Sequence, residues 1–312
     1  MIYKEIAELI HKHIFQVLVR NQLNVFLIGS EQGTRNSLRD PLRKELLDVL
    51  YYPSLEVFYP EELFDELFQG RNQIDLLRLE NLLAKSVHAI VIVLESPGAI
   101  AELGAFANHE ELKKRLIVIV DQKYKKDKSF IMLGPVKMLK KTNGAVIYYD
   151  FEDRNNESLK KLGEQTRGDI RRIAKQVTPD NTIKNLINAQ FFLLAAVYVM
   201  QPIGWLEINE MIKAIGGEDE EIVLAIANSS LNILLRNKEL VLLSGKYELT
   251  KEGLKRITDL LRHRWPSNII LDKLRVVVLN NTLRKNRRWG AQVLSSADAR
   301  LLQLVDGANR HP

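Results

Sequence analysis

The chain has 312 residues, of which 46% are hydrophobic and 27% charged, a composition typical of globular proteins that allows one large domain or two smaller ones. It contains no cysteine, which excludes disulfide scaffolds, thiol nucleophiles, iron–sulfur clusters and cysteine-bearing zinc sites. The net charge of +6 is unevenly distributed, because residues 262–312 carry ten Lys or Arg against three Asp or Glu, leaving about −1 for the rest.

The N-terminal segment MIYKEIAELIHKHIF mixes charged and apolar residues and lacks the pattern of a secretion signal. The most apolar stretch, FFLLAAVYVM at residues 191–200, is too short to cross a bilayer and predicts a buried helix. We therefore expect a cytoplasmic protein without membrane contact.

Short apolar runs alternate with amphipathic segments through the first half of the chain, which predicts strands and helices around a parallel sheet. The runs are rich in β-branched residues and nearly continuous, as expected for strands buried on both faces. Residues 1–151 are therefore predicted to form an α/β domain with a flavodoxin/Rossmann-like five-stranded parallel sheet. The predicted strands are Asn24–Gly29, Leu55–Pro60, Val87–Leu94, Arg115–Val120 and Ala145–Asp150.

A basic connection, Lys123–Asn143, joins the last two predicted strands, either as a solvated loop or as an edge of a ligand site. Residues 152–182 then predict a helical linker between domains, ending at Thr178-Pro179-Asp180. Residues 183–262 follow as three helices and two short strands, Leu240–Leu243 and Tyr247–Thr250, which is the order of a winged-helix domain. Residues 263–312 are predicted to be a basic tail.

The segment LESPGAIAELGAF at residues 94–106 combines a strand end, a turn and a helix start. The strand ends at Leu94 and Glu95 lies at its carboxyl end, Ser96 is a candidate N-cap, and Gly98 would let a ligand approach closely. Glu102 falls in about the second turn of the helix. In open parallel sheets this position faces the crevice where ligands bind, so the segment predicts two carboxylates within reach of one cleft.

Cleavage of an N-glycosidic bond requires stabilisation of an oxocarbenium-like sugar carbon, which a carboxylate beneath the ring provides. Glu102 is the candidate for that role. Glu95 is the first choice for a second acid, with Asp75 and Glu80 as weaker candidates. The alternative for Glu102 is structural, because a helix dipole favours any carboxylate near the N-terminus.

The loop GSEQGTRNSLRD at residues 29–40 follows the first strand, and its amides at Gly29 and Ser30 could hold a phosphate or ribose. Arg35 and Asn36 are candidate contacts to phosphate or sugar, with a solvated arginine and a helix cap as the alternative. Asn108 either lines the cleft or ends an exposed turn. The six histidines show no metal-binding spacing, so no metal is predicted.

The stretch from Asn24 to Asp150, with the phrases FLIGSEQGTRNSLRDPL, LENLLAKSVHAIVIVL and ESPGAIAELGAF, resembles the nucleoside deoxyribosyltransferase-like family. More narrowly, FYPEELFDELFQG, LENLLA, ESPGAIAELGAFAN and SFIMLGPVKMLKK, followed by a winged helix, resemble the effector proteins of type II retrons. Such effectors are encoded with a reverse transcriptase and the branched RNA–DNA (msDNA) that it makes, in bacterial anti-phage systems.

The resemblance implies that Glu102 of AELG occupies the catalytic glutamate position and that the enzyme is a nucleotide N-glycosidase. It further implies that NAD is the substrate rather than a cofactor, and that the toxic effector is restrained in a higher-order assembly with reverse transcriptase and msDNA. Ordinary transferases of the family have an aspartate shortly before that glutamate. Here the nearest acid is Glu95, seven residues upstream. The resemblance therefore assigns no role to Glu95 and does not imply deoxyribosyl transfer.

Two parts of the second half are candidates for nucleic-acid contact. The predicted recognition helix, Glu221–Arg236, follows the acidic run 218–221, which opposes duplex phosphates and favours docking to protein or to the retron. The tail instead places indoles beside arginines, which suits single-stranded or branched nucleic acid, the alternative being a solvated basic helix whose Trp packs on the core. The predicted contacts are Arg284, Lys285, Arg287, Arg288 and Trp289. The rival interpretation of the whole chain is a non-catalytic, nucleotide-sensing winged-helix regulator.

Overall fold

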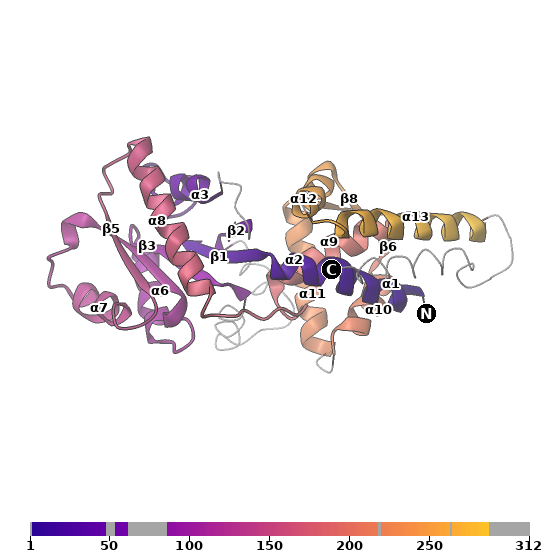
Figure 1. Cartoon of the computed structure of the whole chain (residues 1–312), viewed down its shortest axis with the longest axis horizontal. Helices are drawn as coiled ribbons and strands as arrows, with labels where there is room; N and C mark the ends of the chain where they lie inside the picture. Colours follow the sequence, from indigo (N-terminus) through magenta and orange to yellow (C-terminus); the bar gives the residue numbers. More distant parts are fainter. Residues whose placement is uncertain (1, 48–53, 62–85, 218–219, 263, 287–312) are drawn as a thin grey trace. The chain divides into compact units, whose positions relative to one another are not determined.

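A computed structural model describes residues 2–47, 54–61, 86–217, 220–262 and 264–286 of the chain (Figure 1). The chain divides into two compact units. The first, here called the sheet unit, is Asn21–Asp180, and the second, the helical unit, combines Met1–Arg20 with Asn181–Pro312. This division differs from the predicted boundaries at both ends of the sheet, because the first 20 residues belong with the C-terminal half and the predicted linker helix belongs with the sheet.

The sheet unit contains the predicted five-stranded parallel sheet, in the order β2-β1-β3-β4-β5. This flavodoxin-like order changes direction between β1 and β3, and ligands of such folds bind at that switch point. Side chains of β3 and β4 are buried throughout, whereas the edge strand β5 is mostly half-buried, so the prediction of full burial is confirmed for the centre of the sheet. The strands are β1 (Gln22–Ile28), β2 (Ser54–Phe58), β3 (Ala89–Val93), β4 (Leu116–Asp121) and β5 (Ala145–Tyr149).

Helices cover both faces of this sheet. On one face α3 (Arg39–Leu47) packs beside α8 (Asn156–Ala174), which crosses the strands in Figure 1. Four apolar side chains of α8 join the core on this face, which is why the predicted linker helix is part of the sheet unit. The helix α6 (Pro97–Asn108) packs on β3, and its buried side chains do not belong to that core, so α6 covers the opposite face.

Short helical turns form the basic connection between β4 and β5. These turns are η3 (Gln122–Tyr124), η4 (Met132–Val136) and α7 (Lys137–Leu139), and a further turn, η2 (Lys113–Arg115), comes before β4. Met132, Val136 and Leu139 are buried beneath them, while the lysines of the connection remain exposed. The connection is therefore an ordered surface segment anchored by its apolar residues.

The helical unit is built around α9 (Leu186–Met200), which is buried on nearly all sides, as its apolar sequence predicts. The N-terminal residues pack here because their apolar face meets α9 and α10. Those residues form α1 (Ile2–Ile10), the π-helical turn η1 (His11–Phe15) and α2 (Gln16–Arg20). None of the helices in the described part of the chain is long and apolar enough to cross a membrane.

A three-stranded antiparallel sheet in the order β6-β8-β7 completes the helical unit. The predicted hairpin is present within one residue at each strand, and its turn residues Ser244 and Gly245 both have positive φ, as a two-residue hairpin turn requires. The strands are β6 (Ile203–Gly204), β7 (Leu240–Leu243) and β8 (Lys246–Leu249), and the surrounding helices are α10 (Trp205–Ile215), α11 (Glu220–Arg236) and α12 (Lys251–Leu261).

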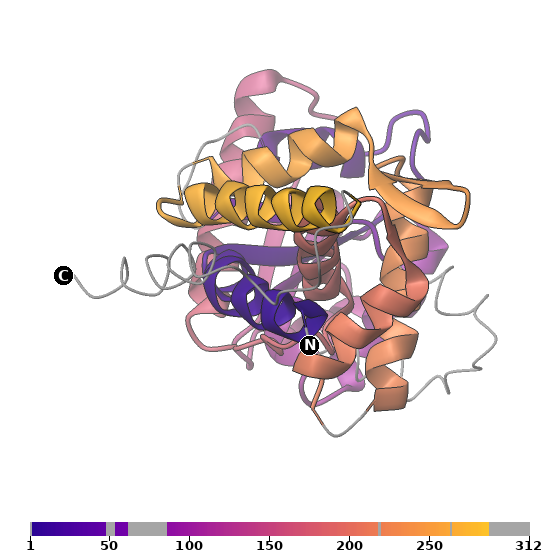
Figure 2. The ribbon, with the colours of Figure 1, turned by 90° about the vertical axis from the view of Figure 1, so that its right-hand side faces the viewer.

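The first part of the predicted tail is the helix α13 (Ser267–Asn286), which contacts α9 and η1 (Figure 2). Ile270, Leu271 and Leu274 are buried, and the Ser267 hydroxyl donates a 2.7 Å hydrogen bond to the His13 carbonyl. These contacts place α13 in the core of the helical unit, in contrast to the predicted tail. The side chain of Trp265 does not pack on that core, since 74% of its surface is exposed.

Candidate active site

Three strands of the sheet unit end beside one another at the switch point. Gly29 and Ser30 follow β1, Glu61 lies three residues past β2, and the segment Glu95-Ser96 follows β3. Because parallel strands all end at the same edge of a sheet, this arrangement collects side chains that are far apart in the sequence.

The Glu95 carboxylate is anchored to the loop that follows β1. Its Oε1 accepts hydrogen bonds from the Ser30 amide at 3.1 Å and from the Ser37 hydroxyl at 2.7 Å, and its Oε2 accepts one from the Leu38 amide at 2.7 Å. Both carboxylate oxygens are thus engaged. The sequence predicted a second catalytic acid here, whereas these hydrogen bonds describe a group that holds the loop against the end of β3.

The amides of the loop after β1 bind carboxylates of the protein itself. Those of Ser30 and Leu38 donate to Glu95, and the Gly33 amide donates to Asp40 Oδ2 at 3.0 Å. A Cβ atom at Gly29 would lie 2.8 Å from Glu95 Oε1, so the glycine is required by the approach of Glu95. The loop has the anion-binding character that its sequence predicts, but these amides already have an internal anion.

The other two predicted residues of this loop are exposed. Asn36 adopts a left-handed conformation with φ of 64°, and its carbonyl accepts a 2.6 Å hydrogen bond from Arg154. Arg35 projects from the same exposed turn. In the described part of the chain, neither residue has a hydrogen bond or ion pair that joins it to Glu102.

The start of α6 has the predicted capping structure. The Ser96 hydroxyl accepts from the Ala99 amide at 3.2 Å and donates to the Gly29 carbonyl at 3.0 Å, while Pro97 is in the first helical turn. Ser96 therefore ties the helix to the loop as well as capping it. A Cβ atom at Gly98 would come no closer than 3.9 Å to the Ser96 hydroxyl, so the protein itself leaves this position open.

Glu102 is half-buried in the second turn of α6. Within the described part of the chain no hydrogen bond or ion pair engages its carboxylate. Burial raises the pKa of Glu102, the nearby charge of Glu61 raises it further, and Arg39 opposes both effects. Its electrostatic neighbours are thus Glu61 and Arg39, neither of which the sequence analysis identified.

Arg39 organises this side of the site from a buried position. Its guanidinium forms a two-pronged ion pair with Glu61, with Nη1–Oε1 at 2.7 Å and Nη2–Oε2 at 2.8 Å. The same group donates to the carbonyls of Leu27 at 3.0 Å and Ser30 at 2.8 Å, and lies 3.9 Å from the centroid of the Tyr59 ring. Glu61 is therefore held by an arginine that is itself bound to the end of β1.

The remaining predicted site residues lie elsewhere. Asn108 is the exposed last residue of α6, six residues and about 9 Å along the helix axis from Glu102, so it is remote from the switch point. Asp75 and Glu80 lie outside the described residues. No group of three or more metal-binding side chains occurs in the described ranges.

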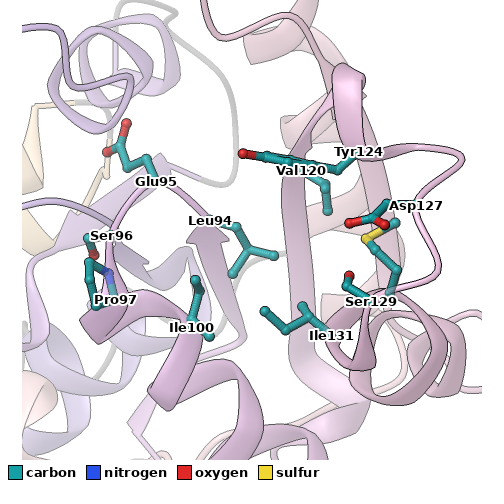
Figure 3. Close-up of a pocket in the computed structure, with 11 residues that line it drawn as sticks. Leu94, Glu95, Ser96, Pro97, Ile100, Val120, Tyr124, Asp127, Ser129 and Ile131 are labelled. Atoms are coloured by element: carbon teal, nitrogen blue, oxygen red, sulfur yellow. The ribbon is translucent and has the colours of Figure 1, made fainter.

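A cavity of about 390 Å³ opens on the other flank of α6 (Figure 3). Ile100 lines it and Glu102 does not, because two residues along a helix turn the side chain by about 200°. In Figure 3 the side chains of Leu94, Ile100 and Ile131 face one another across the cavity, and Tyr124 and Asp127 stand on its far wall. The cavity lining is Leu94, Glu95, Ser96, Pro97, Ile100, Val120, Tyr124, Asp127, Ser129, Ile131 and Met132.

The fold and this edge define a doubly wound α/β protein with two neighbouring carboxylates at its switch point, Glu61, which Arg39 holds, and Glu102, which has no ion-pair partner in the described part of the chain. The model of the family described as "STM3845 retron effector protein" matches residues 35–242, which include these residues and part of the helical unit. The chain therefore belongs to the retron effector family, as the sequence resemblance implied.

Two curated Escherichia coli proteins are similar to the chain. It is 29% identical over 268 residues to the "Retron Ec86 putative ribosyltransferase/DNA-binding protein", a match covering 83% of this chain and 85% of that protein. It is 36% identical over 119 residues to the "Retron Ec73 putative ribosyltransferase/DNA-binding protein", a match covering 37% of each.

Proposed function

We propose that the chain is the toxic effector of an anti-phage retron and that its sheet unit hydrolyses NAD to nicotinamide and ADP-ribose. The observation that carries the proposal is Glu102, a half-buried carboxylate without a protein partner among the described residues, at the ligand-binding edge of the sheet. The relatives' names, which refer to ribosyl transfer, support a reaction at a sugar carbon.

The chemistry requires one reactive carboxylate. As the bond between C1′ of the ribose and the nicotinamide nitrogen breaks, its electron pair leaves with the ring and positive charge develops at C1′. The ionised Glu102 stabilises that charge or bonds to C1′, and water then supplies the hydroxyl group while releasing a proton. Because nicotinamide departs from a cationic precursor as a neutral molecule, it needs no acid to protonate it.

The contrast between the two carboxylates of the motif supports this choice of substrate. A neutral nucleoside needs a proton donor at its base, and Glu95 is committed to three hydrogen bonds with the loop. A site with one uncommitted carboxylate is therefore better matched to a cationic leaving group. The neighbouring Glu61 adds a second negative charge, which disfavours ionised Glu102 in the free enzyme and favours a positively charged transition state.

NAD hydrolysis by the purified full chain, and by the chain assembled with its reverse transcriptase and msDNA, tests the proposal. We expect NAD loss and equimolar nicotinamide, abolished in Glu102→Gln and retained in Glu111→Gln, which removes an exposed carboxylate that pairs with Lys114. NADH, whose nicotinamide is not cationic, should be resistant. Stable NAD under all of these conditions, including in infected cells, would contradict the proposed reaction.

We further propose that the helical unit is a winged-helix domain that docks the effector on its retron partners in the cytoplasm. The strand order β6-β8-β7 and the helices α9, α10 and α11 support this assignment. The recognition helix α11 begins with Glu220 and Glu221, which oppose duplex phosphates. Arg284 and Lys285 belong to the last turn of α13, and Arg287, Arg288 and Trp289 lie outside the described residues.

Comparing co-purification of reverse transcriptase with the intact chain and with a hairpin variant tests the docking role. Leu242 and Leu243 are about half exposed on β7, so their replacement by serine removes an apolar surface without opening the core. We expect reduced recovery of the complex with an unchanged melting temperature. Full recovery would argue against docking through this hairpin.

A further inference from the structure

The connection between β4 and β5 carries a concentration of positive charge that the proposed reaction does not use. Residues 123–141 contain seven lysines and a single acid, and all seven lysines are exposed. Of these seven lysines, Lys123 is the one with a carboxylate partner in the described part of the chain, Asp121 at 2.8 Å. We define these lysines together with the exposed apolar residues between them as the lysine face.

Two of these lysines from distant parts of the connection lie close together in space. Lys125 and Lys140 come from opposite arms of the connection, yet their ammonium groups lie 5.4 and 5.1 Å from the centroid of the same Tyr148 ring on β5. Lys140 also hydrogen-bonds to the Tyr148 hydroxyl at 3.1 Å. Holding like charges around one ring costs free energy in the absence of a counter-charge, and a polyanion would supply one.

Exposed apolar side chains lie between the lysines. Phe130 is 85% exposed and Leu133 is 53% exposed, although they are large enough to favour burial. Three lysines lie between Phe130 and Tyr124, and Tyr124 lines the cavity beside α6. Aromatic rings set among lysines match the two chemistries of a single nucleic-acid strand, whose phosphates are anionic and whose unpaired bases stack.

We propose that the lysine face and the adjoining cavity bind single-stranded nucleic acid, with phosphates on the lysines and unpaired bases on Phe130 and in the cavity. The cavity wall has the Asp127 carboxylate and the Ser129 hydroxyl, which can accept hydrogen bonds from the amino group of a base. A duplex satisfies the lysines but not the aromatic side chains, because its bases are already stacked and paired. The cavity shares Glu95 and Ser96 with the switch-point edge, but Ile100 lines it and Glu102 does not, so strand binding there does not require the Glu102 carboxylate.

Fluorescence anisotropy of the full chain with a labelled 20-nucleotide single strand tests the proposal. The variant Lys125→Gln/Lys126→Gln/Lys128→Gln should lower the slope of log K against log salt by about 2, at about 0.7 for each phosphate that is no longer neutralised. The variant Phe130→Ala should weaken binding roughly tenfold or more, because a base can no longer stack on the ring. Because these side chains are exposed, the melting temperature should not change.

Matched controls separate this site from the other basic segment and from the reaction. Neutralising the four basic residues of 284–288 should leave the effects of the lysine-face variants intact, and Glu102→Gln should bind the strand as the unaltered chain does. Unchanged affinity in both lysine-face variants overturns the proposal. Equal or tighter binding of polyglutamate or of a duplex also overturns it, and would assign the face to an acidic protein or to paired DNA.

Discussion

Replacing Glu95 or Glu102 of the segment 94–106 by glutamine should have opposite effects on the stability of the protein. Glu95 accepts three hydrogen bonds, from Ser30, Ser37 and Leu38, whereas Glu102 has no such partner among the described residues. A glutamine at position 95 has one carbonyl oxygen and an amino group that itself donates. At least one of the three donors would therefore face another donor and lose its partner.

The expected cost in free energy follows from the hydrogen bonds that are broken. A hydrogen bond to a charged group contributes about 1.5–3 kcal/mol, and an unsatisfied buried donor costs about 1–3 kcal/mol. Since Glu95 is only partly buried, we expect Glu95→Gln to cost about 2–3 kcal/mol, or roughly 4–12 °C in melting temperature for a unit of this size. Glu102→Gln removes a charge that Glu61 repels, so its stability should equal or exceed that of the unaltered chain.

Calorimetry of the full chain measures both variants, with Glu111→Gln as the control for loss of an exposed, ion-paired glutamate. Hydrogen exchange localises the effect, because the amides of Ser30 and Leu38 lose their acceptor in Glu95→Gln and should exchange faster. An unchanged melting temperature and unchanged exchange for Glu95→Gln would refute its anchoring role. Equal destabilisation by Glu102→Gln would show that Glu102 is structural too.

Three further measurements examine the same edge of the sheet. Gly29→Ala should destabilise by about 1–3 kcal/mol, because its Cβ would meet Glu95 Oε1 at 2.8 Å, whereas Gly98→Ala should leave urea unfolding within about 0.5 kcal/mol and impair only ligand binding. Ser96→Ala should cost about 0.5–2 kcal/mol in the same assay by removing the cap of α6, and Ser96→Thr should restore most of it. The raised pKa of Glu102 means that the folded state binds a proton at this carboxyl more tightly than the unfolded state does. The resulting contribution to the free energy of unfolding is lost as the pH rises from the ordinary pKa of 4.5 through the raised pKa. Urea midpoints should show this loss in the unaltered chain but not in Glu102→Gln, and NAD cleavage should increase over the same pH window.

Local sequence signals predicted the parts of the fold that depend on local chemistry. The five strands lie within two residues of their predicted bounds because each is a short β-branched run, and Ser96 caps α6 as its position before Pro97 indicates. The first helices were assigned to the wrong unit because an amphipathic pattern shows that a helix has an apolar face but not what covers it. In α13 the basic residues concealed the apolar spacing of Ile270, Leu271 and Leu274.

The pairing of Arg39 with Glu61 could not be predicted from spacing. It depends on the order β2-β1-β3, which brings the end of β2 beside the start of α3, and the strand order is not encoded in any single segment. Asp40, the neighbour of Arg39, entered the sequence analysis only as the last residue of the loop 29–40. In the structure its carboxylate accepts hydrogen bonds from the Tyr59 hydroxyl at 2.5 Å and from the Gly33 amide. Once the sheet order is known, an arginine at the start of α3, close to an acid that follows β2, becomes a recognisable feature.

The charged groups at this edge of the sheet differ in whether they have partners within the protein, which is consistent with a fixed frame around one group proposed to react. Hydrogen bonds hold Glu95 to the loop, and Arg39 holds Glu61 to the end of β1, so the frame of the site is fixed by charges that are satisfied within the protein. Glu102 lies against this frame without a partner of its own among the described residues and under repulsion from Glu61. Functional groups are commonly kept in such electrostatically unfavourable surroundings, because binding of the substrate then removes the repulsion. A cationic sugar carbon is the species that would do so here, and a neutral or anionic one would not.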